Sequence, residues 1–403
     1  MGSSPPDDIP IVARIRSYFS LLRATKEEVE QIKIPGLGEK RFKHMVYQLV
    51  DDLIIDLKEH VSTIEELEDV DTKSELSESI HRSLEAFLNW IDVILRHCNA
   101  VSLELHEFVS YILKDLNLEN IDYLLLSGSE LSEASLSEGL SKLFIALFEK
   151  ARDRITREFP SFCIIFIPQS LLKNPINWSL CVHEIGHMVE NERLRIVENF
   201  YPRPEFSPVS TRIMYNSEAL KHWYSKEFQA DFFAQSYCGP IFTSQLVDNF
   251  FTKEIFILPT HPSWEERTRA LAEELRKMKL EDFARRLMER AKELPHSDPL
   301  IKREALEHLS TIIDKTKNFL LENNSIYEIK NEKLESVRES LENFVPYTDD
   351  VKVLLNVAEE VKRTLLDSTK GLKRKEKIEI EFDNLIEDSI RLSNLKRIKL
   401  RGN

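Results

Sequence analysis

Glycine is scarce in this chain, and its scarcity limits the folds that the chain can adopt. Only 9 of the 403 residues are glycine, whereas an average protein of this length would contain about 7%. Glycine supplies the positive φ angles of tight turns, bulges and phosphate-binding loops. The composition therefore disfavours a glycine-rich nucleotide-binding core and a β-sandwich with many turns. It favours a fold built from long helices.

The spacing of apolar residues supports this helical interpretation. Through residues 11–158 apolar side chains recur at every third or fourth position, for example at Ile80, Leu84, Phe87 and Ile91. This period is typical of an amphipathic helix. The same spacing returns after Pro295, where glutamate and lysine fill the other faces. We therefore expect helices at both ends of the chain.

Two segments instead have the pattern of strands. Residues 162–168 read Phe-Cys-Ile-Ile-Phe-Ile-Pro, an apolar and β-branched run between prolines, and form the best candidate strand. Ile378, Ile380 and Phe382 alternate with charged residues and predict an edge strand. Residues 117–137 lack a clear period, and we expect loop or short helices there. Changes in the residue pattern along the chain divide it into predicted domains at 1–157, 158–295 and 296–403.

Charge and cysteine content limit the possible partners and the compartment. The chain has 55 basic and 69 acidic residues, a net charge of −14, which disfavours a general nucleic-acid binder. Its four cysteines form no C-x-x-C pair, so a disulfide scaffold is not expected and a cytoplasmic location is predicted. We find neither a signal peptide nor an apolar run long enough for a transmembrane helix. The basic residues of 391–401 predict a final amphipathic helix that docks on an acidic body.

One short motif carries the most specific chemistry in the sequence. Residues 183–187 read His-Glu-Ile-Gly-His, and Asn174-Pro175 before them predicts a helix cap. On a helix His183 and His187 leave the same face, so both imidazoles can bind one Zn²⁺. Glu184 lies beside the first ligand, where it can take a proton from zinc-bound water without binding the metal.

A catalytic zinc needs a third protein ligand, and a later helix offers one. Residues 227–231 read Glu-Phe-Gln-Ala-Asp. Glu227 is the predicted third ligand, and Asp231 lies one turn further on the same face, where it can accept the outer N–H of a ligand histidine. Glu190 and His222 are alternative third ligands.

A third block follows at residues 260–267, which read Thr-His-Pro-Ser-Trp-Glu-Glu-Arg. Pro262 and the two glutamates suit the first turn of a helix that runs towards Met278. A helix start explains the proline and the acids, but it does not account for His261 or Arg267.

Together the three blocks resemble a zinc metallopeptidase of the gluzincin type, and most closely the M48 group of Ste24-like and HtpX-like peptidases. The stretch from Glu227 to Pro240 is also similar to the ImmA/IrrE-like peptidases. The resemblance covers roughly residues 160–275. Its motifs are H-E-x-x-H (His183, Glu184, His187), E-x-x-A-D (Glu227, Ala230, Asp231) and T-H-P followed by arginine (Thr260, His261, Pro262, Arg267).

The apolar spacing and the resemblance together predict a mostly α (α+β) fold, in which helical domains flank a zincin-like core with a small β-sheet. The resemblance also implies that His261 and Arg267 help to hold the tetrahedral intermediate, and that the strand at 163–168 pairs with an extended substrate. We therefore predict a soluble zinc-dependent endopeptidase that acts on a peptide or protein substrate, with Glu184 as general base. The alternative is a zinc-containing regulatory or sensor protein with little or no peptidase activity.

Overall fold

The chain folds into two compact units, and each is described by itself. The first comprises residues 1–103, 121–128 and 134–166, and the second comprises residues 104–120, 129–133 and 167–403. The three-domain division at residues 157 and 295 stays a prediction. No described helix is both long and apolar enough to cross a membrane. The computed structural model describes residues 11–33, 38–128, 131–135, 140, 143–144, 147–204, 217–251, 261–292, 302–328 and 331–401.

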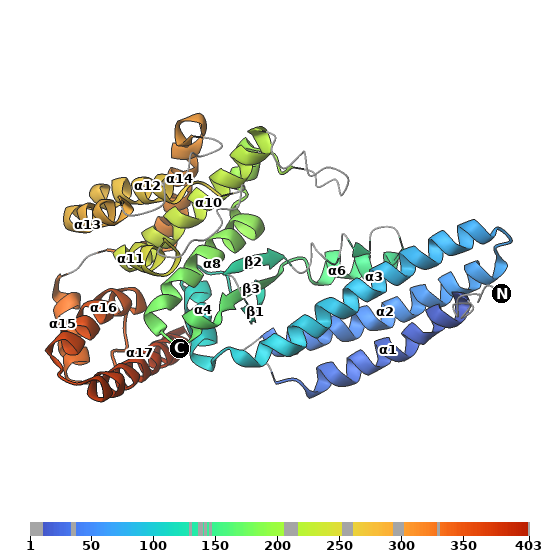
Figure 1. The fold of residues 1–403 in the computed structure, drawn as a ribbon, viewed down its shortest axis with the longest axis horizontal. Coiled ribbons are helices and arrows are strands. Elements are labelled where there is room, and N and C mark those ends of the chain that lie inside the picture. Colours follow the sequence, from blue (N-terminus) through green and yellow to red (C-terminus); the bar gives the residue numbers. More distant parts are fainter. Residues whose placement is uncertain are drawn as a thin grey trace, which may run out of the picture. The chain divides into compact units, whose positions relative to one another are not determined.

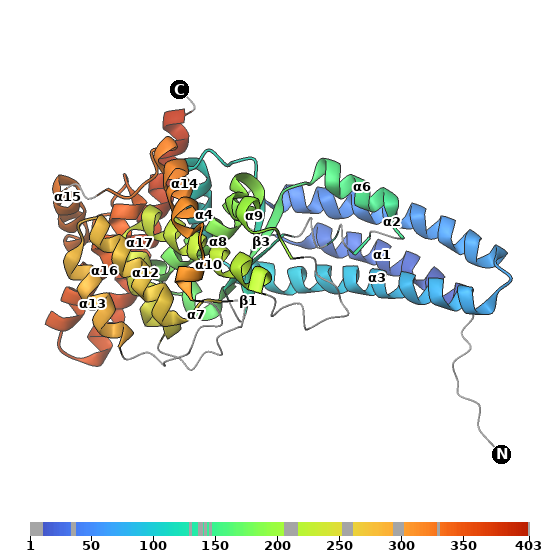
Figure 2. The same cartoon turned by 90° about the horizontal axis from the view of Figure 1, so that it is seen from above.

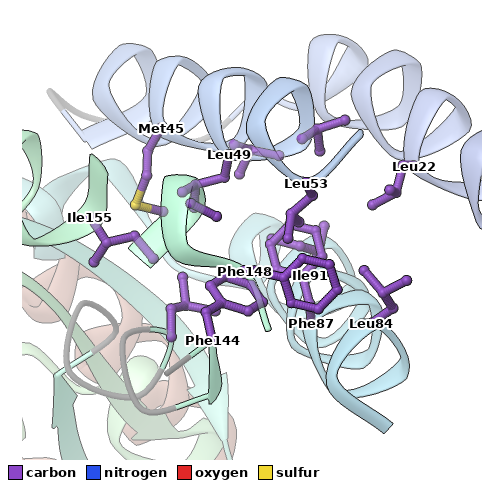
Figure 3. Packing of buried hydrophobic residues seen from close by; sticks show 14 of the residues in the cluster. Leu22, Met45, Leu49, Leu53, Leu84, Phe87, Ile91, Phe144, Phe148 and Ile155 are labelled. Atoms are coloured by element: carbon purple, nitrogen blue, oxygen red, sulfur yellow. The ribbon is translucent and has the colours of Figure 1, made fainter. Parts of the chain in front are cut away.

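Long helices build the first unit, as predicted. Helices α1, α2 and α3 lie side by side, and α6 packs on α2 (Figures 1 and 2). Their apolar faces meet in one core, where Leu49 and Leu84 lie close to the rings of Phe87 and Phe148 (Figure 3). The bounds are α1 (Ile11–Gln31), α2 (Gly38–Glu66), α3 (Val70–His97), the 3₁₀ turn η1 (Cys98–Ala100) and α6 (Glu149–Glu158).

A three-stranded sheet has the order β1-β3-β2, with β1 at Asp122–Gly128, β2 at Ser132–Ser135 and β3 at Phe162–Pro168. The strand predicted at 162–168 is confirmed as β3. The expectation of loop or short helices over 117–137 is wrong where β1 and β2 form. In β1 three successive leucines are buried, as in a strand covered on both faces, and such a run has no alternating pattern to recognise.

The second unit is almost entirely helical, and α10 (Ser217–Cys238) is its central helix. It contacts α8, α12, α14 and α16, and the ribbon shows α8 and α10 as neighbours (Figure 1). The other elements are α4 (Leu103–Asp115), α7 (Gln169–Leu172), η2 (Pro175–Leu180), α8 (Cys181–Val189), η3 (Glu190–Leu194), α9 (Ile196–Phe200), α11 (Pro240–Leu246), η5 (Val247–Phe251), α12 (Trp264–Lys277), α13 (Glu281–Ala291), η6 (Arg303–Ala305), α14 (Leu309–Glu322), α15 (Asn331–Glu342), α16 (Val351–Ser368) and α17 (Leu372–Arg401).

The sharp end of α10 depends on a glycine. Gly239 has a φ of +75°, and a Cβ there would lie 2.5 Å from the Tyr327 ring. Only glycine fits this position without strain. Pro240 then starts α11, so the chain turns directly from the central helix into the next one.

The edge strand predicted at 378–382 is wrong, because these residues lie in α17. Phe382, Ile386 and Ile390 are buried at intervals of four, which is the helical period, whereas Ile380 is 62% exposed. The predicted docking of the C-terminal helix is confirmed at Arg397, which donates a hydrogen bond to Asp115 of α4.

Candidate metal centre

The first two predicted ligands lie on a buried helix. Asn174 accepts a hydrogen bond from the Ile176 backbone N–H at 3.1 Å, and the 3₁₀ turn η2 leads directly into α8. His183 and His187 project from the same face of α8, and their Nε2 atoms lie 3.1 Å apart. The local sequence thus brings two imidazole nitrogens to one point, as predicted.

Helix α10 adds Glu227 to this pair. Its Oε2 lies 3.4 Å from His183 Nε2, and its Oε1 lies 3.3 Å from His187 Nε2. In a tetrahedral zinc site with bonds of about 2.0–2.1 Å, neighbouring ligand atoms lie roughly 3.3–3.4 Å apart. The separations found here are of this order, and each of the two histidine nitrogens lies near a different oxygen of Glu227. His183, His187 and Glu227 form a group that could hold a metal ion.

The chemistry of the atoms in this group also fits a cation. Glu227 Oε2 is buried and makes no hydrogen bond with the described residues, although a buried carboxylate oxygen normally has a partner. The two Nε2 atoms face each other, and two neutral acceptor nitrogens at 3.1 Å repel unless a proton or a cation lies between them. Two imidazoles and one carboxylate are ligands that zinc commonly takes in catalytic sites.

Asp231 lies behind the first histidine and is fully buried. Its Oδ1 lies 3.0 Å from His183 Nδ1, close enough for charge attraction, although the N–H does not align for a hydrogen bond. Arg267 donates to both oxygens of Asp231, from Nε at 2.7 Å and from Nη2 at 2.6 Å. Burial would raise the pKa of Asp231, but Arg267 and His183 outweigh it and hold that pKa below its usual value.

Arg267 lies buried at the candidate site, among partners from the protein itself. Besides its fork on Asp231, its Nη1 lies 3.5 Å from Glu227 Oε2, and its guanidinium packs on the Trp264 ring at 5.0 Å. Only 3% of the residue is exposed. These partners belong to the protein itself, so the geometry makes Arg267 a positioning residue for Asp231 and Glu227. Contact of Arg267 with a tetrahedral intermediate stays a prediction.

His261 lies at the more open side of the group. Its Nε2 is 3.3 Å from Glu227 Oε1, and a third of its side chain is exposed. Ser263 then caps α12 by accepting a hydrogen bond from the Glu266 N–H at 3.3 Å, which confirms the predicted helix start. Thr260 lies outside the described residues. His261 is thus placed beside a ligand oxygen without being one of the three converging ligands.

The pKa values of the two histidines are shifted in opposite directions. Burial would lower the pKa of His183, but Asp231, Glu227 and Glu184 together raise it to about 10. Burial lowers the pKa of His187 to about 4, and Glu227 offsets this only in part. The metal-free site therefore holds a proton on His183 and a neutral imidazole at His187. Glu184 itself is buried on α8 between the two ligands.

The two alternative ligands have other roles in the structure. Glu190 accepts a hydrogen bond from the Val197 N–H at 2.6 Å, within the turn that follows α8. The His222 Nδ1 atom lies 2.7 Å from the Tyr201 carbonyl oxygen. Neither residue belongs to the converging group. Among the described residues, Glu227 is the one that joins the two histidines in a group that could hold a metal ion.

Sequence reasoning did not identify two neighbours of the site. The Phe242 ring of α11 stacks on the His183 ring, with centroids 6.3 Å apart and planes within 8°. Gly186 faces Ala230 so closely that a Cβ atom added at Gly186 would lie 3.1 Å from the Cα atom of Ala230. The glycine inside the motif was a usable signal, since a glycine in a helix often marks a close backbone approach. Phe242 had no such signal.

A scan against protein-family models and searches of curated proteins and of solved structures found no match to this chain.

Proposed function

We propose that this protein is a zinc-dependent endopeptidase of the gluzincin type, with a zincin-like core similar to that of the M48 or ImmA/IrrE-like peptidases. The observation that carries the proposal is the convergence of His183, His187 and Glu227, each of which offers one ligand atom within 4.8 Å of the others. The placement of Glu184 and His261 around that group supports hydrolysis over a purely structural metal, because a structural site needs neither residue. The predicted cytoplasmic location is part of the same proposal.

Bound zinc would polarise a peptide carbonyl and make water acidic enough to lose a proton near neutral pH. Glu184 accepts that proton as general base and delivers it to the leaving amine. His261 lies at the exposed side of Glu227, where its N–H can donate to the oxyanion that forms on the substrate. Asp231 and Arg267 hold His183 and Glu227 in place from behind.

The test of this proposal is hydrolysis of an unfolded protein by zinc-loaded enzyme, with Glu184→Gln as the variant. The substitution keeps the size of the side chain and removes its basicity, so we expect bound zinc to be unchanged and the rate to fall by about 100-fold or more. Full activity in Glu184→Gln would exclude Glu184 as the base and with it the proposed mechanism.

The burial of the group favours a second candidate. Only 7% of His183 and 5% of Glu184 are exposed, and a site this closed would also suit a zinc-containing regulatory or sensor protein. In that case zinc would bind, but no peptide would be cleaved and Glu184→Gln would leave partner binding unchanged. Hydrolysis that depends on Glu184 separates the two candidates.

A further inference from the structure

The turn between α16 and α17 carries a concentration of positive charge that the metal site does not use. Residues 370–377 contain five lysines or arginines and one acid, in a chain whose net charge is −14. Lys370, Lys373 and Arg374 are exposed, and none of their side chains forms an ion pair or hydrogen bond with any described residue. We call these three residues, together with Leu372, the basic tip.

The position of these charges is unfavourable for folding. Helix α17 begins at Leu372, and its first turn contains Lys373 and Arg374 but no acidic residue. The N-terminal end of a helix carries partial positive charge, so cations there destabilise the helix. Nor do these side chains stabilise the fold through partners. Neither the helix end nor a contact with the described residues accounts for these cations.

An apolar side chain projects from the middle of the basic tip. Leu372 is 74% exposed, more than any other large apolar side chain in the described part of the chain. The neighbouring Gly371 has a φ of +92°, and a Cβ there would meet nothing within 4 Å. The turn thus stands clear of the rest of its own unit.

The base of the basic tip is firmly held. Phe382 and Ile386 of α17 are buried, and Lys362 of α16 donates to Asp383 of α17 at 2.7 Å. The three exposed cations and Leu372 are therefore presented on a fixed hairpin of two helices.

We propose that the basic tip binds the anionic lipid surface of a membrane, with Leu372 entering the headgroup region. Each lysine or arginine in a cluster near an acidic lipid surface raises the affinity for that surface about fivefold. An adjacent apolar side chain adds to the binding. A site for single-stranded nucleic acid would combine such cations with aromatic rings, and residues 365–380 contain none. At physiological salt, acidic residues more than about 8 Å from the basic tip have little effect on its attraction to an anionic surface, because their charge is screened. The proposal does not depend on the metal site.

The experiment is co-sedimentation of the full chain with phosphatidylcholine vesicles that contain either no acidic lipid or about 30% phosphatidylserine. We expect binding to the acidic vesicles alone, weakening as salt is raised. The triple variant Lys370→Gln/Lys373→Gln/Arg374→Gln should bind about 100-fold more weakly. Leu372→Ser should bind roughly tenfold more weakly. The triple variant should unfold at the same temperature as the parent or a higher one, because it removes cations from a helix N-terminus.

The matched control is Arg276→Gln/Lys279→Gln/Lys302→Gln, which removes the same charges from exposed positions on other elements of the same unit. It should bind acidic vesicles almost as well as the parent. Equal losses in the two triple variants would show that only overall charge matters and would overturn the proposal. So would absence of binding to acidic vesicles, or binding to a single-stranded oligonucleotide that depends on the basic tip.

Discussion

Asp231 connects the metal-binding group to the positive charge behind it. It lies 3.0 Å from His183 Nδ1 and accepts two hydrogen bonds from the buried Arg267. A carboxylate in this position sets the tautomer and orientation of the ligand histidine, and its loss typically lowers metal affinity 10–100-fold. A buried arginine without its partner also destabilises the fold, because it keeps its desolvation cost.

We therefore expect Asp231→Asn to lower zinc affinity by about 10–100-fold and the free energy of unfolding by about 3–5 kcal/mol. Competition with a chelator and urea unfolding measure the two effects. The control is Asp282→Asn, which breaks an exposed pair with Arg285 at 2.7 Å and should change stability by at most about 0.5 kcal/mol. Similar small effects in both variants would contradict the role of Asp231.

The protonation of His183 gives a second prediction. In the metal-free protein its pKa is raised to about 10, so this group contributes stability that is complete below pH 6.5, its ordinary pKa, and is lost as the pH rises through about 10. At pH 7.5 zinc must displace that proton, whereas the neutral His187 has none to lose. Calorimetry in buffers of different ionisation enthalpy should show release of about one proton per zinc. Binding without proton release would mean that His183 is neutral before the metal arrives.

At the scale of elements, the metal group depends on how closely α8 approaches α10. A Cβ at Gly186 would lie 3.1 Å from both Ala230 Cα and Phe233 Cδ1. The backbone atom cannot move without moving α10, so a methyl group would push apart the two helices that carry the ligands. Zinc binding and helix packing are therefore linked at this residue.

Gly186→Ala should accordingly lower zinc affinity and reduce the free energy of unfolding by about 1–3 kcal/mol. In an exposed helix the same substitution would be stabilising, because alanine has the higher helix propensity. Chelator competition and urea unfolding again provide the measurements. An increase in stability with unchanged zinc affinity would show that the two helices tolerate the wider spacing.

The sequence predicted those elements whose pattern is local. The helices that carry residues 183–187 and 227–231 and the strand at 162–168 were recognisable from the sequence, and all three are confirmed. Strands β1 and β2 were missed, because pairing with β3 rather than local preference determines them. The strand predicted at 378–382 failed because an alternation over five residues also occurs by chance on a helix with one buried side.

At the scale of the whole second unit, Asp115 ties α4 to the C-terminal helices. It accepts a hydrogen bond from Arg397 of α17, and its Oδ2 lies 3.5 Å from the buried Lys352 Nζ of α16. The Asp115 carbonyl oxygen also accepts from Ser325 at 2.9 Å. One carboxylate thus neutralises two cations from segments more than 200 residues away in the sequence.

Asp115→Asn should leave both cations without a charged partner and reduce the free energy of unfolding by about 3–5 kcal/mol. The control is Glu335→Gln, which removes an exposed partner of Arg338 and should cost at most about 0.5 kcal/mol. Urea unfolding compares the two variants. A loss below about 1 kcal/mol for Asp115→Asn would mean that water replaces the carboxylate and that this junction is not needed for folding.

The candidate site shows the same division between local and distant information. His183, Glu184 and His187 follow from one motif, and Glu227 with Asp231 follows from a second, so these residues could be named from the sequence. The two hydrogen bonds from Arg267 to Asp231 join residues 36 positions apart in the sequence, and no local spacing predicts them. The distances therefore add a positioning role for Arg267, and its contact with the tetrahedral intermediate stays a prediction.

The most direct test of the central claim is the metal content of the protein purified without added metal, measured by elemental mass spectrometry beside His187→Ala. We predict about one zinc per chain in the parent protein and almost none in the variant, because two remaining ligands cannot hold the ion. A parent protein that contains no zinc and takes up none at sub-micromolar concentrations would contradict the proposed metal centre and the enzyme built on it.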